Sequence, residues 1–386
     1  MNSFLGYRRA DGTVGIRNHV VVIPSVSCAN GVVAAIAREV PELVPLYHGH
    51  GCGRGGQDAE RHLKTLVNLG RHPNVAGVLI IGLGCEVIRG EFLLEGIKPS
   101  GKPVELLNIQ SEGGSQKTAR KGITIARKML QEVESLKKEA VPWSSLILGL
   151  ECGGSDAFSG VTANSAVGKV SDWLVAKGGT VILTENTEMI GTCHILKARS
   201  CTEQVGADVE DMINRAETRS REILGPHAIA AISPGNMDGG MSSIMEKSLG
   251  CIIKGGTTPI NQVLAYGEVP SAKGLVLMDA PGYDTESMAG MVAGGAQLML
   301  FTTGRGNPLG FPTVPVIKIA STSRLFESMN DDMDINAGEI LDGKSIDEVG
   351  QTIIEKIIRV IEGEQTRAET NRQDGILCLY TAYASM

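Results

Sequence analysis

The sequence predicts an α/β protein whose sheets are largely parallel and Rossmann-like. Short apolar runs alternate with stretches of helical period, which is the pattern of βαβ units. Most of these runs end in glycine-rich polar turns, as expected for the loops that follow strands. Glycine accounts for 49 of the 386 residues and aromatic residues for only 4%. A glycine share well above the average of about 7% favours many tight turns between strands and helices.

Two domains are expected, because a single hydrophobic core rarely serves more than about 250–300 residues. A long helix with a charged outer face is predicted over residues 114–138, and Pro142 and Trp143 follow its charged tail. We place the boundary at that tail. The prediction is a first α/β domain of residues 1–138 and a C-terminal α/β domain of residues 139–386.

The individual elements follow from two patterns. An apolar run bounded by turn residues predicts a buried strand, and apolar residues at helical period predict a helix. The predicted strands are residues 19–26, 44–47, 77–83, 146–150 and 180–183, then those in GLVLMDAPGYD, AQLMLFTTGRGNP and VPVIKIAS. The predicted helices are residues 31–40, 58–69, 114–138, 203–224 and 345–362.

Composition and charge argue against several classes of function. The net charge is −7 and no basic run occurs, so nucleic-acid binding is not expected, whereas a local pocket for an anion remains compatible. Neither a P-loop nor a GxGxxG fingerprint is present, which argues against nucleotide binding. No apolar run approaches the roughly 20 residues of a membrane span. The N-terminus lacks the apolar core of a signal peptide. We therefore expect a cytoplasmic protein whose eight cysteines are thiols or metal ligands.

Residues 145–160, SLILGLECGGSDAFSG, carry the densest group of reactive side chains. The apolar run ends at Glu151 and Cys152, and open α/β sheets bind ligands at this edge of their strands. Two glycines then allow close approach of a ligand to the backbone, before Ser155 and Asp156. We take Glu151 and Asp156 as catalytic candidates, Cys152 as a metal ligand and Ser155 as a substrate contact. The alternative is a cysteine that only packs beside turn glycines.

A second group lies in the glycine-rich stretch HGHGCGRGGQD. His48, His50 and Cys52 alternate with glycines, so their side chains share one side if the segment is extended. Imidazole and thiolate suit iron or zinc. We take His48 and His50 as catalytic candidates, His48 and Cys52 as metal ligands and Arg54 as a substrate-binding residue. The alternative is a flexible loop with solvated histidines.

Three thiols, those of Cys52, Cys85 and Cys152, are candidates for one metal site. They can hold an iron–sulfur cluster or, with the histidines, a mononuclear ion. No CxxC pair is present, so the local spacing typical of a cluster is missing. A mononuclear divalent metal with mixed ligands is therefore favoured over a cluster, and the absence of any metal is a third possibility.

Charged residues near other strand ends complete the candidate set. The cationic candidates are Arg8, Arg9, Arg17, Lys247, Lys254, Arg305 and Lys318. Lys247 and Lys254 are expected to face a carboxylate, and Arg305 lies in a glycine-rich turn suited to bidentate anion binding. The alternative for each is an ordinary surface salt bridge. Lys318 stands within the apolar run VIKIA, where a solvated position is difficult to sustain. Glu185 as a catalytic group and Asp284 as a substrate contact follow strands, where carboxylates act as bases or ligands.

Several motifs in order resemble the altronate dehydratase/galactarate dehydratase family of sugar-acid lyases. They are GYRRADGTVGIRN, HGHGCG with Asp58, RHPNVAGVLIIGLGCE, GLECGGSDAFSG, TANSAVGKVSD, LTENTEMIG, SPGN, KSLG, APGYD, FTTGRGNP and MDINAG. The likeness covers nearly the whole chain. It implies two α/β domains that follow a small SAF domain, and elimination of water from an aldarate or aldonate. It also implies a divalent metal, with Fe²⁺ expected first, Mn²⁺ second and an iron–sulfur cluster less favoured.

The resemblance also implies a partner. The chain begins at GYRRADG without a SAF domain, which looks like the split arrangement in which that domain is a separate small subunit, as in (2R)-sulfolactate sulfo-lyase. Arg54 departs from the dehydratase pattern and suits a second strong anion such as a sulfonate. We therefore expect the large subunit of an oligomeric β-eliminating lyase for a small anionic 2-hydroxy acid. Its expected reaction converts sulfolactate to pyruvate and sulfite. The alternatives are a sugar-acid dehydratase subunit and a non-catalytic, substrate-binding scaffold for the small partner.

Overall fold

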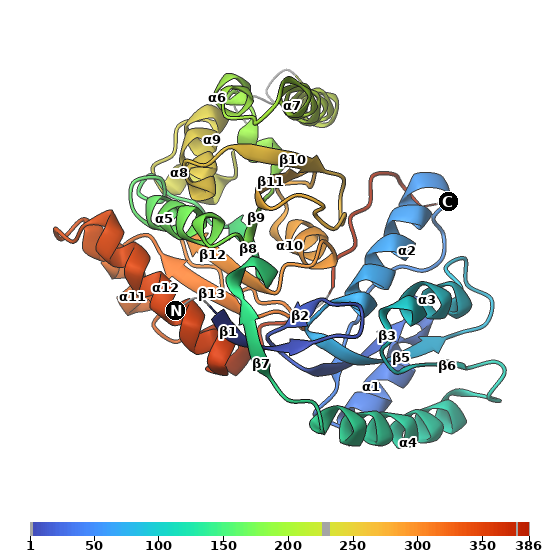
Figure 1. Ribbon diagram of the computed structural model, residues 1–386. Coiled ribbons are helices and arrows are strands. Elements are labelled where there is room, and N and C mark those ends of the chain that lie inside the picture. The colour runs from blue at the N-terminus through green and yellow to red at the C-terminus, as the bar shows by residue number, and fades with distance from the viewer. Residues whose placement is uncertain (1–2, 226–231, 376, 386) are drawn as a thin grey trace. The chain divides into compact units, whose positions relative to one another are not determined.

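The computed structural model describes residues 3–225, 232–375 and 377–385, and it confirms the predicted α/β class (Figure 1). The chain divides into two compact units. The described residues of Ser3–Val141, Phe311–Val314 and Asp374–Met386 form what we call the N-terminal unit, and those of Pro142–Gly310 and Pro315–Gln373 form the C-terminal unit. Nothing in the sequence predicted that Phe311–Val314 and the described residues of Asp374–Met386 belong to the N-terminal unit. The domain boundary at residues 138 and 139 stays a prediction.

The C-terminal unit is built on a seven-stranded sheet. In spatial order its strands are β10 (Ile260–Leu264), β11 (Gly274–Met278), β9 (Thr180–Leu183), β8 (Ile147–Cys152), β12 (Leu298–Thr303), β13 (Val316–Ala320) and β14 (Ile335–Asn336). All neighbouring pairs are parallel, so every strand ends at the same edge. The chain passes from β8 to β9 on one side, and the later strands β12, β13 and β14 follow one another on the other side of β8. The carboxyl ends of β8 and β12 therefore lie at the switch point where open α/β sheets bind ligands.

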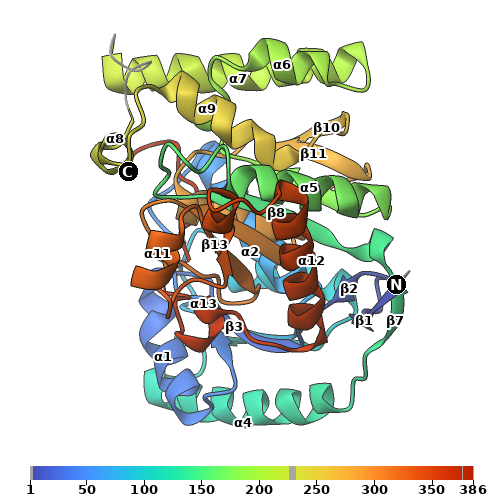
Figure 2. The ribbon, with the colours of Figure 1, turned by 90° about the vertical axis from the view of Figure 1, so that its left-hand side faces the viewer.

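Helices cover this sheet and extend beyond one end of it (Figures 1 and 2). They are α5 (Ala163–Ala176), α6 (Cys193–Ala198), α7 (Glu203–Leu224), α8 (Pro234–Asp238), α9 (Ile244–Ile252), α10 (Asp284–Ala293), α11 (Ser323–Ser328), α12 (Ile346–Glu362) and α13 (Arg367–Thr370). Helices α5 and α12 pack against each other, and α10 packs against β8. No described helix combines the length and apolar character needed to cross a bilayer.

The N-terminal unit holds a four-stranded parallel sheet and a small additional sheet. The parallel sheet has the order β4 (Val44–Pro45), β3 (His19–Pro24), β5 (Val75–Gly82) and β6 (Val104–Asn108). The small sheet contains β2 (Val14–Gly15), β1 (Ser3–Arg8) and β7 (Glu139–Pro142). The helices are α1 (Asn30–Glu39), α2 (Gly56–Arg71), α3 (Gly90–Ile97) and α4 (Ser115–Glu134).

The alternating faces of β3 and β5 explain how this unit buries its core. Val20 and Val22 join a cluster that includes residues of α1 and α4. Ile23, on the opposite face of β3, lies beside Gly70 of α2. A strand buried on both faces reads as the continuous apolar run that predicted it. The predicted helices over 31–40, 58–69, 114–138, 203–224 and 345–362 correspond to α1, α2, α4, α7 and α12, although α4 ends four residues earlier than predicted.

Gly338 shows how tightly the C-terminal unit packs. It lies in the 3₁₀ helix η7 (Ala337–Ile340), and an added Cβ would lie 2.0 Å from the backbone nitrogen of Ser323. Because backbone atoms cannot turn aside, we expect Gly338→Ala to lower the free energy of unfolding by about 1–3 kcal/mol. Chemical denaturation followed by circular dichroism measures this loss. In the matched control Gly31→Ala, the methyl group meets nothing within 4 Å. An equal loss in both variants would contradict the prediction.

Candidate metal centre and active site

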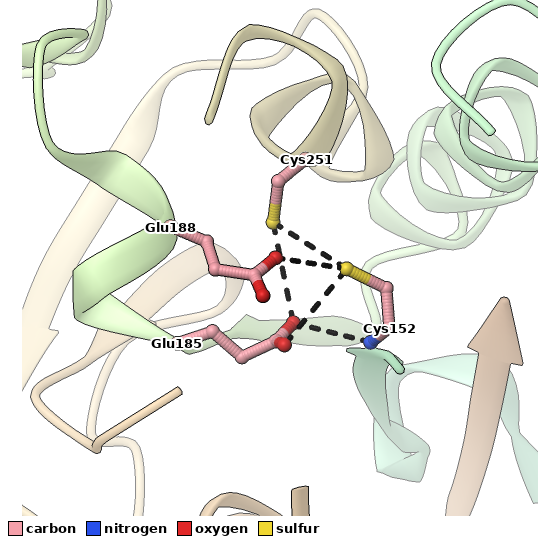
Figure 3. A group of neighbouring side chains, drawn as sticks. All are labelled: Cys152, Glu185, Glu188 and Cys251. Carbon is pink, nitrogen blue, oxygen red and sulfur yellow. Dashed lines mark hydrogen bonds between the residues drawn. The ribbon is translucent and has the colours of Figure 1, made fainter. Parts of the chain in front are cut away.

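Four buried side chains meet at the carboxyl edge of the large sheet: Cys152, Glu185, Glu188 and Cys251 (Figure 3). One ligand atom from each lies within 4.8 Å of the others. They come from the end of β8, the turn after β9, the 3₁₀ helix η4 (Asn186–Met189) and the last turns of α9. We call this group the thiol–carboxylate cluster.

The local backbone directs Glu185 into the cluster. Its φ of 68° lies in the left-handed region, which costs a non-glycine residue roughly 1–3 kcal/mol. The backbone N–H of Cys152, on the neighbouring strand, donates to Oε2 of Glu185 at 3.1 Å. Nζ of Lys254 donates to the same oxygen at 2.8 Å, and both of these side chains are fully buried. The surrounding contacts therefore offset the strain and hold the carboxylate at the cluster.

The spacing of the four groups suits a tetrahedral metal ion. Sγ of Cys152 lies 3.0 Å from Oε2 of Glu188 and 3.8 Å from Oε1 of Glu185. Sγ of Cys251 lies 3.9 Å from the sulfur of Cys152 and 4.0 Å from Oε2 of Glu185. Metal bonds of about 2.3 Å to sulfur and about 2.1 Å to oxygen separate tetrahedral ligands by roughly 3.4–3.8 Å. The observed separations bracket that range.

Two lysines balance the charge of the cluster. Lys254 pairs with Glu185, and Lys247 forms an ion pair with Glu188. Burial works to raise the pKa of Glu188, but Lys247 and Lys254 hold it below its ordinary value. With both thiols deprotonated, the cluster carries four negative charges against two from the lysines. A divalent cation would bring the site to neutrality.

The two thiols of the cluster restrict which metal ions it can bind. A hydrogen bond with Cys251 and burial raise the pKa of Cys152 well above its ordinary value, so the thiol keeps its proton until a cation binds. Sulfur ligands favour soft or borderline metals such as iron and zinc over magnesium and calcium. The predicted divalent metal thus has a site that can bind it, and Cys152, Glu185, Glu188 and Cys251 would hold it.

A cavity of about 360 Å³ adjoins the cluster. Its walls include Glu188 of the cluster, Lys247 and Asp284. The remaining lining residues are Gly153, Gly154, Thr187, Ile190, Ser220, Leu224, Ile232, Ser233, Asn236, Ile244 and Gly282. Lys247 is the only cation among these lining residues. The cavity can therefore receive one anionic group of a small polar molecule directly beside the cluster.

Asp284 is the carboxylate in this wall best suited to act as a base. Nδ2 of Asn307 donates to its Oδ2 at 2.7 Å. Burial, followed by the charge of Glu188, raises the pKa of Asp284 to about 6. A carboxylate with this pKa is mostly ionised at neutral pH, yet it is more basic than an exposed aspartate.

Glu151 lies behind this wall as a buried acid. It forms a second group with Glu185 and Asp284, in which one oxygen of each lies within 4.8 Å of the others. Ser287 donates to Oε2 of Glu151 at 2.6 Å, whereas Oε1 has no partner among the described residues. Burial and the nearby charges of Glu185 and Asp284 raise the pKa of Glu151 well above its ordinary value. This environment therefore favours the protonated form of Glu151.

Lys318 is fully buried, in agreement with its position in an apolar run. Its Nζ donates to the carbonyl oxygen of Leu309 at 2.9 Å and lies 3.1 Å from the centroid of the Phe301 ring. Burial lowers the pKa of Lys318 well below its ordinary value, although Asp284 and Glu151 oppose this shift. Lys318 therefore interacts electrostatically with Asp284 and Glu151, and it is not one of the residues that line the cavity.

Three other predicted residues of the C-terminal unit take different positions. Oδ1 of Asp156 accepts from the N–H and Oγ of Ser159, and Oδ2 accepts from Oγ of Ser321, so both oxygens already have partners. Oγ of Ser155 lies 3.7 Å from Sγ of Cys152, at the edge of the cluster. The Arg305 side chain is exposed, while its N–H donates to the Gly154 carbonyl oxygen at 2.7 Å.

The predicted site residues of the N-terminal unit join neither acidic group. Nε2 of His48 bonds the Pro24 carbonyl oxygen at 2.7 Å and its Nδ1 accepts from the N–H of His50, so neither ring nitrogen is free to bind a metal. Cys52 and Cys85 are exposed, and the sulfur of Cys85 accepts from Nε2 of Gln110. Arg54 donates to the backbone oxygen of Tyr383. Of the predicted metal ligands, only Cys152 lies in the cluster.

Sequence reasoning selected neither Cys251 nor Glu188 as a site residue. One signal was available, because Lys247, Cys251 and Lys254 are spaced by four and three residues and therefore share a helix face. Glu185 and Glu188 are likewise three residues apart, the first as the N-cap of η4 and the second within it. Neither spacing says which strand end the groups face. Only the packing of α9 against η4 brings them to Cys152.

Comparison with known proteins gives matches along nearly the whole chain. Residues 143–384 match the family described as D-galactarate/altronate dehydratase, C-terminal, and residues 6–134 match D-galactarate dehydratase/altronate hydrolase, second domain. An altronate dehydratase of Bacillus subtilis is 38% identical over 381 residues, which cover 96% of this chain and 76% of that protein. The galactarate dehydratase (L-threo-forming) of Escherichia coli is 38% identical, with 94% and 73% covered. The (2R)-sulfolactate sulfo-lyase subunit beta of Chromohalobacter salexigens is 33% identical, with 95% and 94% covered.

Proposed function

The chain belongs to the D-galactarate/altronate dehydratase family, and from this premise we propose that it catalyses a metal-dependent β-elimination on a small 2-hydroxy carboxylate. The relatives are dehydratases and a sulfo-lyase subunit, which confirms the expected lyase. One observation supports the reaction type above all others. A neutralised thiol–carboxylate cluster, a cation and a carboxylate of raised pKa meet at one cavity.

Binding of the substrate begins with its carboxylate. Lys247 is the cation in the cavity wall, and it is already paired with Glu188 of the cluster. A substrate carboxylate beside Lys247 therefore lies next to the cluster as well. Gly153 forms part of the same wall, and an added Cβ there would lie 2.1 Å from Oδ2 of Asp284, so the glycine leaves room for that carboxylate.

Elimination then needs a base and an acid. Asp284 accepts the proton from the carbon next to the substrate carboxylate, since it lines the cavity and has a pKa of about 6. Glu151, whose raised pKa favours the protonated form, has an oxygen within 4.8 Å of one of Asp284 and can supply a proton to the site as the group on the β-carbon departs. The enol that remains becomes a 2-oxo acid. When bound at the cluster, the divalent metal supplies positive charge that stabilises the negative charge developing on the substrate carboxylate.

The cavity lining favours a sugar acid as the substrate. Thr187, Ser233 and Asn236 offer hydroxyl and amide groups that suit several substrate hydroxyls. The single lysine suits one carboxylate, as in an aldonate such as altronate. The second candidate is sulfolactate, which the sequence placed first. Its support is the 33% identity to a sulfo-lyase subunit, of which 94% is covered.

One experiment separates these candidates. The anaerobically purified chain, loaded with Fe²⁺ and assayed alone and with co-expressed small partner, is incubated with altronate, galactarate or sulfolactate. We expect a 2-oxo-3-deoxy acid from altronate, measured as its semicarbazone, because of the hydroxyl-binding lining. Release of sulfite and pyruvate from sulfolactate would establish the second candidate instead. If no substrate reacts in either preparation, the proposal of a β-eliminating lyase fails.

The metal and the partner are proposals of their own. Fe²⁺ is the metal that we propose for the cluster, with Mn²⁺ second, because two sulfur and two oxygen ligands suit a borderline divalent ion. The name of the sulfo-lyase relative states that it is one subunit of its enzyme. We propose that this chain also works in an oligomer with a small SAF-domain subunit. Size-exclusion chromatography of the co-expressed chains tests that assembly.

A further inference from the structure

A second pair of potential metal ligands lies in the N-terminal unit, apart from the thiol–carboxylate cluster. His50 is in the glycine-rich loop before α2, and His62 is on the second turn of that helix. Their ring centroids are 4.5 Å apart, and the rings are tilted by 51°. The motif HGHGC drew attention to His50, whereas nothing in the sequence singled out His62. Neither residue has a role in the elimination described above.

The hydrogen bonds of His62 determine which of its nitrogens carries the proton. Nε2 lies 3.1 Å from the carbonyl oxygen of Tyr380 and 3.1 Å from Oγ1 of Thr381. A carbonyl oxygen only accepts, so Nε2 must be the N–H donor. Nδ1 therefore presents a lone pair. Metal-binding histidines usually show this arrangement, in which the other ring nitrogen donates to a carbonyl or carboxylate.

Nδ1 of His62 is an unexplained acceptor. The side chain is fully buried, and Nδ1 has no hydrogen-bond partner among the described residues. Buried polar atoms are paired in the large majority of cases, so an unpaired one needs a cause. The ring of His50 lies beside the ring of His62 and is only half buried. Two imidazole rings thus lie side by side, and Nδ1 of His62 has no hydrogen-bond partner among the described residues.

Contacts from the C-terminal segment, residues 377–385, hold the helix that carries His62. The N–H groups of Ala382 and Tyr383 each donate to the carboxylate of Asp58 at 2.9 Å, one helical turn before His62. The guanidinium of Arg61 lies over the ring of Tyr380, 4.7 Å from its centroid. The orientation of His62 is therefore fixed before any ligand binds, which lowers the ordering cost of binding.

We propose that His50 and His62 form a two-histidine site for a borderline divalent metal ion such as Zn²⁺, separate from the thiol–carboxylate cluster. Imidazole nitrogen is a ligand suited to Zn²⁺, Cu²⁺ and Ni²⁺. Both rings are available in the neutral form that metal binding requires, because burial lowers the pKa of each. An ion bound there would join the glycine-rich loop to α2 and would keep its remaining coordination positions open to water or to another ligand.

Calorimetric titration with Zn²⁺ tests the proposal in full-length protein whose cluster is disabled by Cys152→Ser and Cys251→Ser. We expect the cluster-disabled protein to bind a single Zn²⁺ ion with micromolar affinity. Adding His50→Gln or His62→Gln should weaken this affinity at least tenfold. The matched control is His194→Gln, an exposed histidine of the C-terminal unit, which should leave the affinity unchanged. His50 lies in a half-buried loop position, so the His50→Gln result stands even if His62→Gln fails to fold.

Two outcomes would overturn the site. The first is the absence of Zn²⁺ binding in the cluster-disabled protein, which would mean that the two rings only pack against each other. The second is undiminished binding in His50→Gln, which would place the ion on other residues. Because the readout is metal affinity, the result does not depend on whether the chain is a β-eliminating lyase.

Discussion

Replacing Cys152 with serine is expected to remove the metal and to lower turnover by about 10³-fold or more, while the protein remains folded. Sγ of Cys152 lies 3.0 Å from Oε2 of Glu188, 3.8 Å from Oε1 of Glu185 and 3.9 Å from Sγ of Cys251. The substitution puts a serine hydroxyl in place of this sulfur. A neutral hydroxyl is a weak ligand and leaves the site with an unbalanced charge. Loss of a metal that stabilises developing charge costs several kcal/mol of activation free energy. Elemental analysis and the 2-oxo acid assay measure the two effects.

The matched control is Cys201→Ser, because Cys201 is an exposed thiol outside the cluster. It should keep both the metal content and the turnover of the unchanged protein. If Cys152→Ser also keeps both, the metal centre lies elsewhere. If it loses the metal and turns over normally, the cluster is not catalytic and the scaffold interpretation from the sequence gains support. A melting temperature close to that of the unchanged protein shows that any loss of activity is local.

Replacing Lys254 with methionine is expected to lower the free energy of unfolding of the metal-free protein by roughly 3–5 kcal/mol. Lys254 and Glu185 are both fully buried and form an ion pair at 2.8 Å. Removing the cation leaves Glu185 uncompensated, in a place where burial and Glu188 already raise its pKa to about 7. Urea denaturation of chelator-treated protein measures the loss.

The loss caused by Lys254→Met should grow with pH. In the variant, the folded-state pKa of Glu185 rises further, while its unfolded-state pKa stays near 4.3. A carboxyl group with a raised folded-state pKa does not lower the free energy of unfolding at pH values where it is protonated in both the folded and the unfolded state. The cost begins above the unfolded-state pKa and increases as pH rises toward the folded-state pKa. The effect should therefore be larger at pH 8 than at pH 5.

Two further variants isolate this effect. Adding Glu185→Gln to Lys254→Met removes the buried charge, so much of the loss and its pH dependence should disappear. Lys197→Met removes the cation of an exposed pair with Glu210 and should change stability by less than about 1 kcal/mol. A loss from Lys254→Met that is the same at both pH values would mean that the ion pair does not govern it.

The fold class followed from the sequence because the patterns that predict it are local. Each strand of a doubly covered parallel sheet is apolar on both faces, so runs such as LILGL at 146–150 identify themselves without knowledge of their neighbours. The position of Glu151 and Cys152 at a strand end, and hence at the ligand-binding edge, was also readable in one dimension. The same holds for Lys318, because a lysine within an apolar strand can only be buried.

The composition of the metal centre depended on contacts that are distant in the chain. Cys152 and Cys251 are separated by 99 residues, and Lys254 is 69 residues from Glu185. Their meeting requires β8 beside β9 and α9 packed against η4, which no local spacing specifies. The sequence therefore placed His48, Cys52 and Cys85 in the site on the density of reactive groups alone. Tertiary structure decided that the hydrogen bonds of His48 are already satisfied and that Cys251 is the thiol beside Cys152.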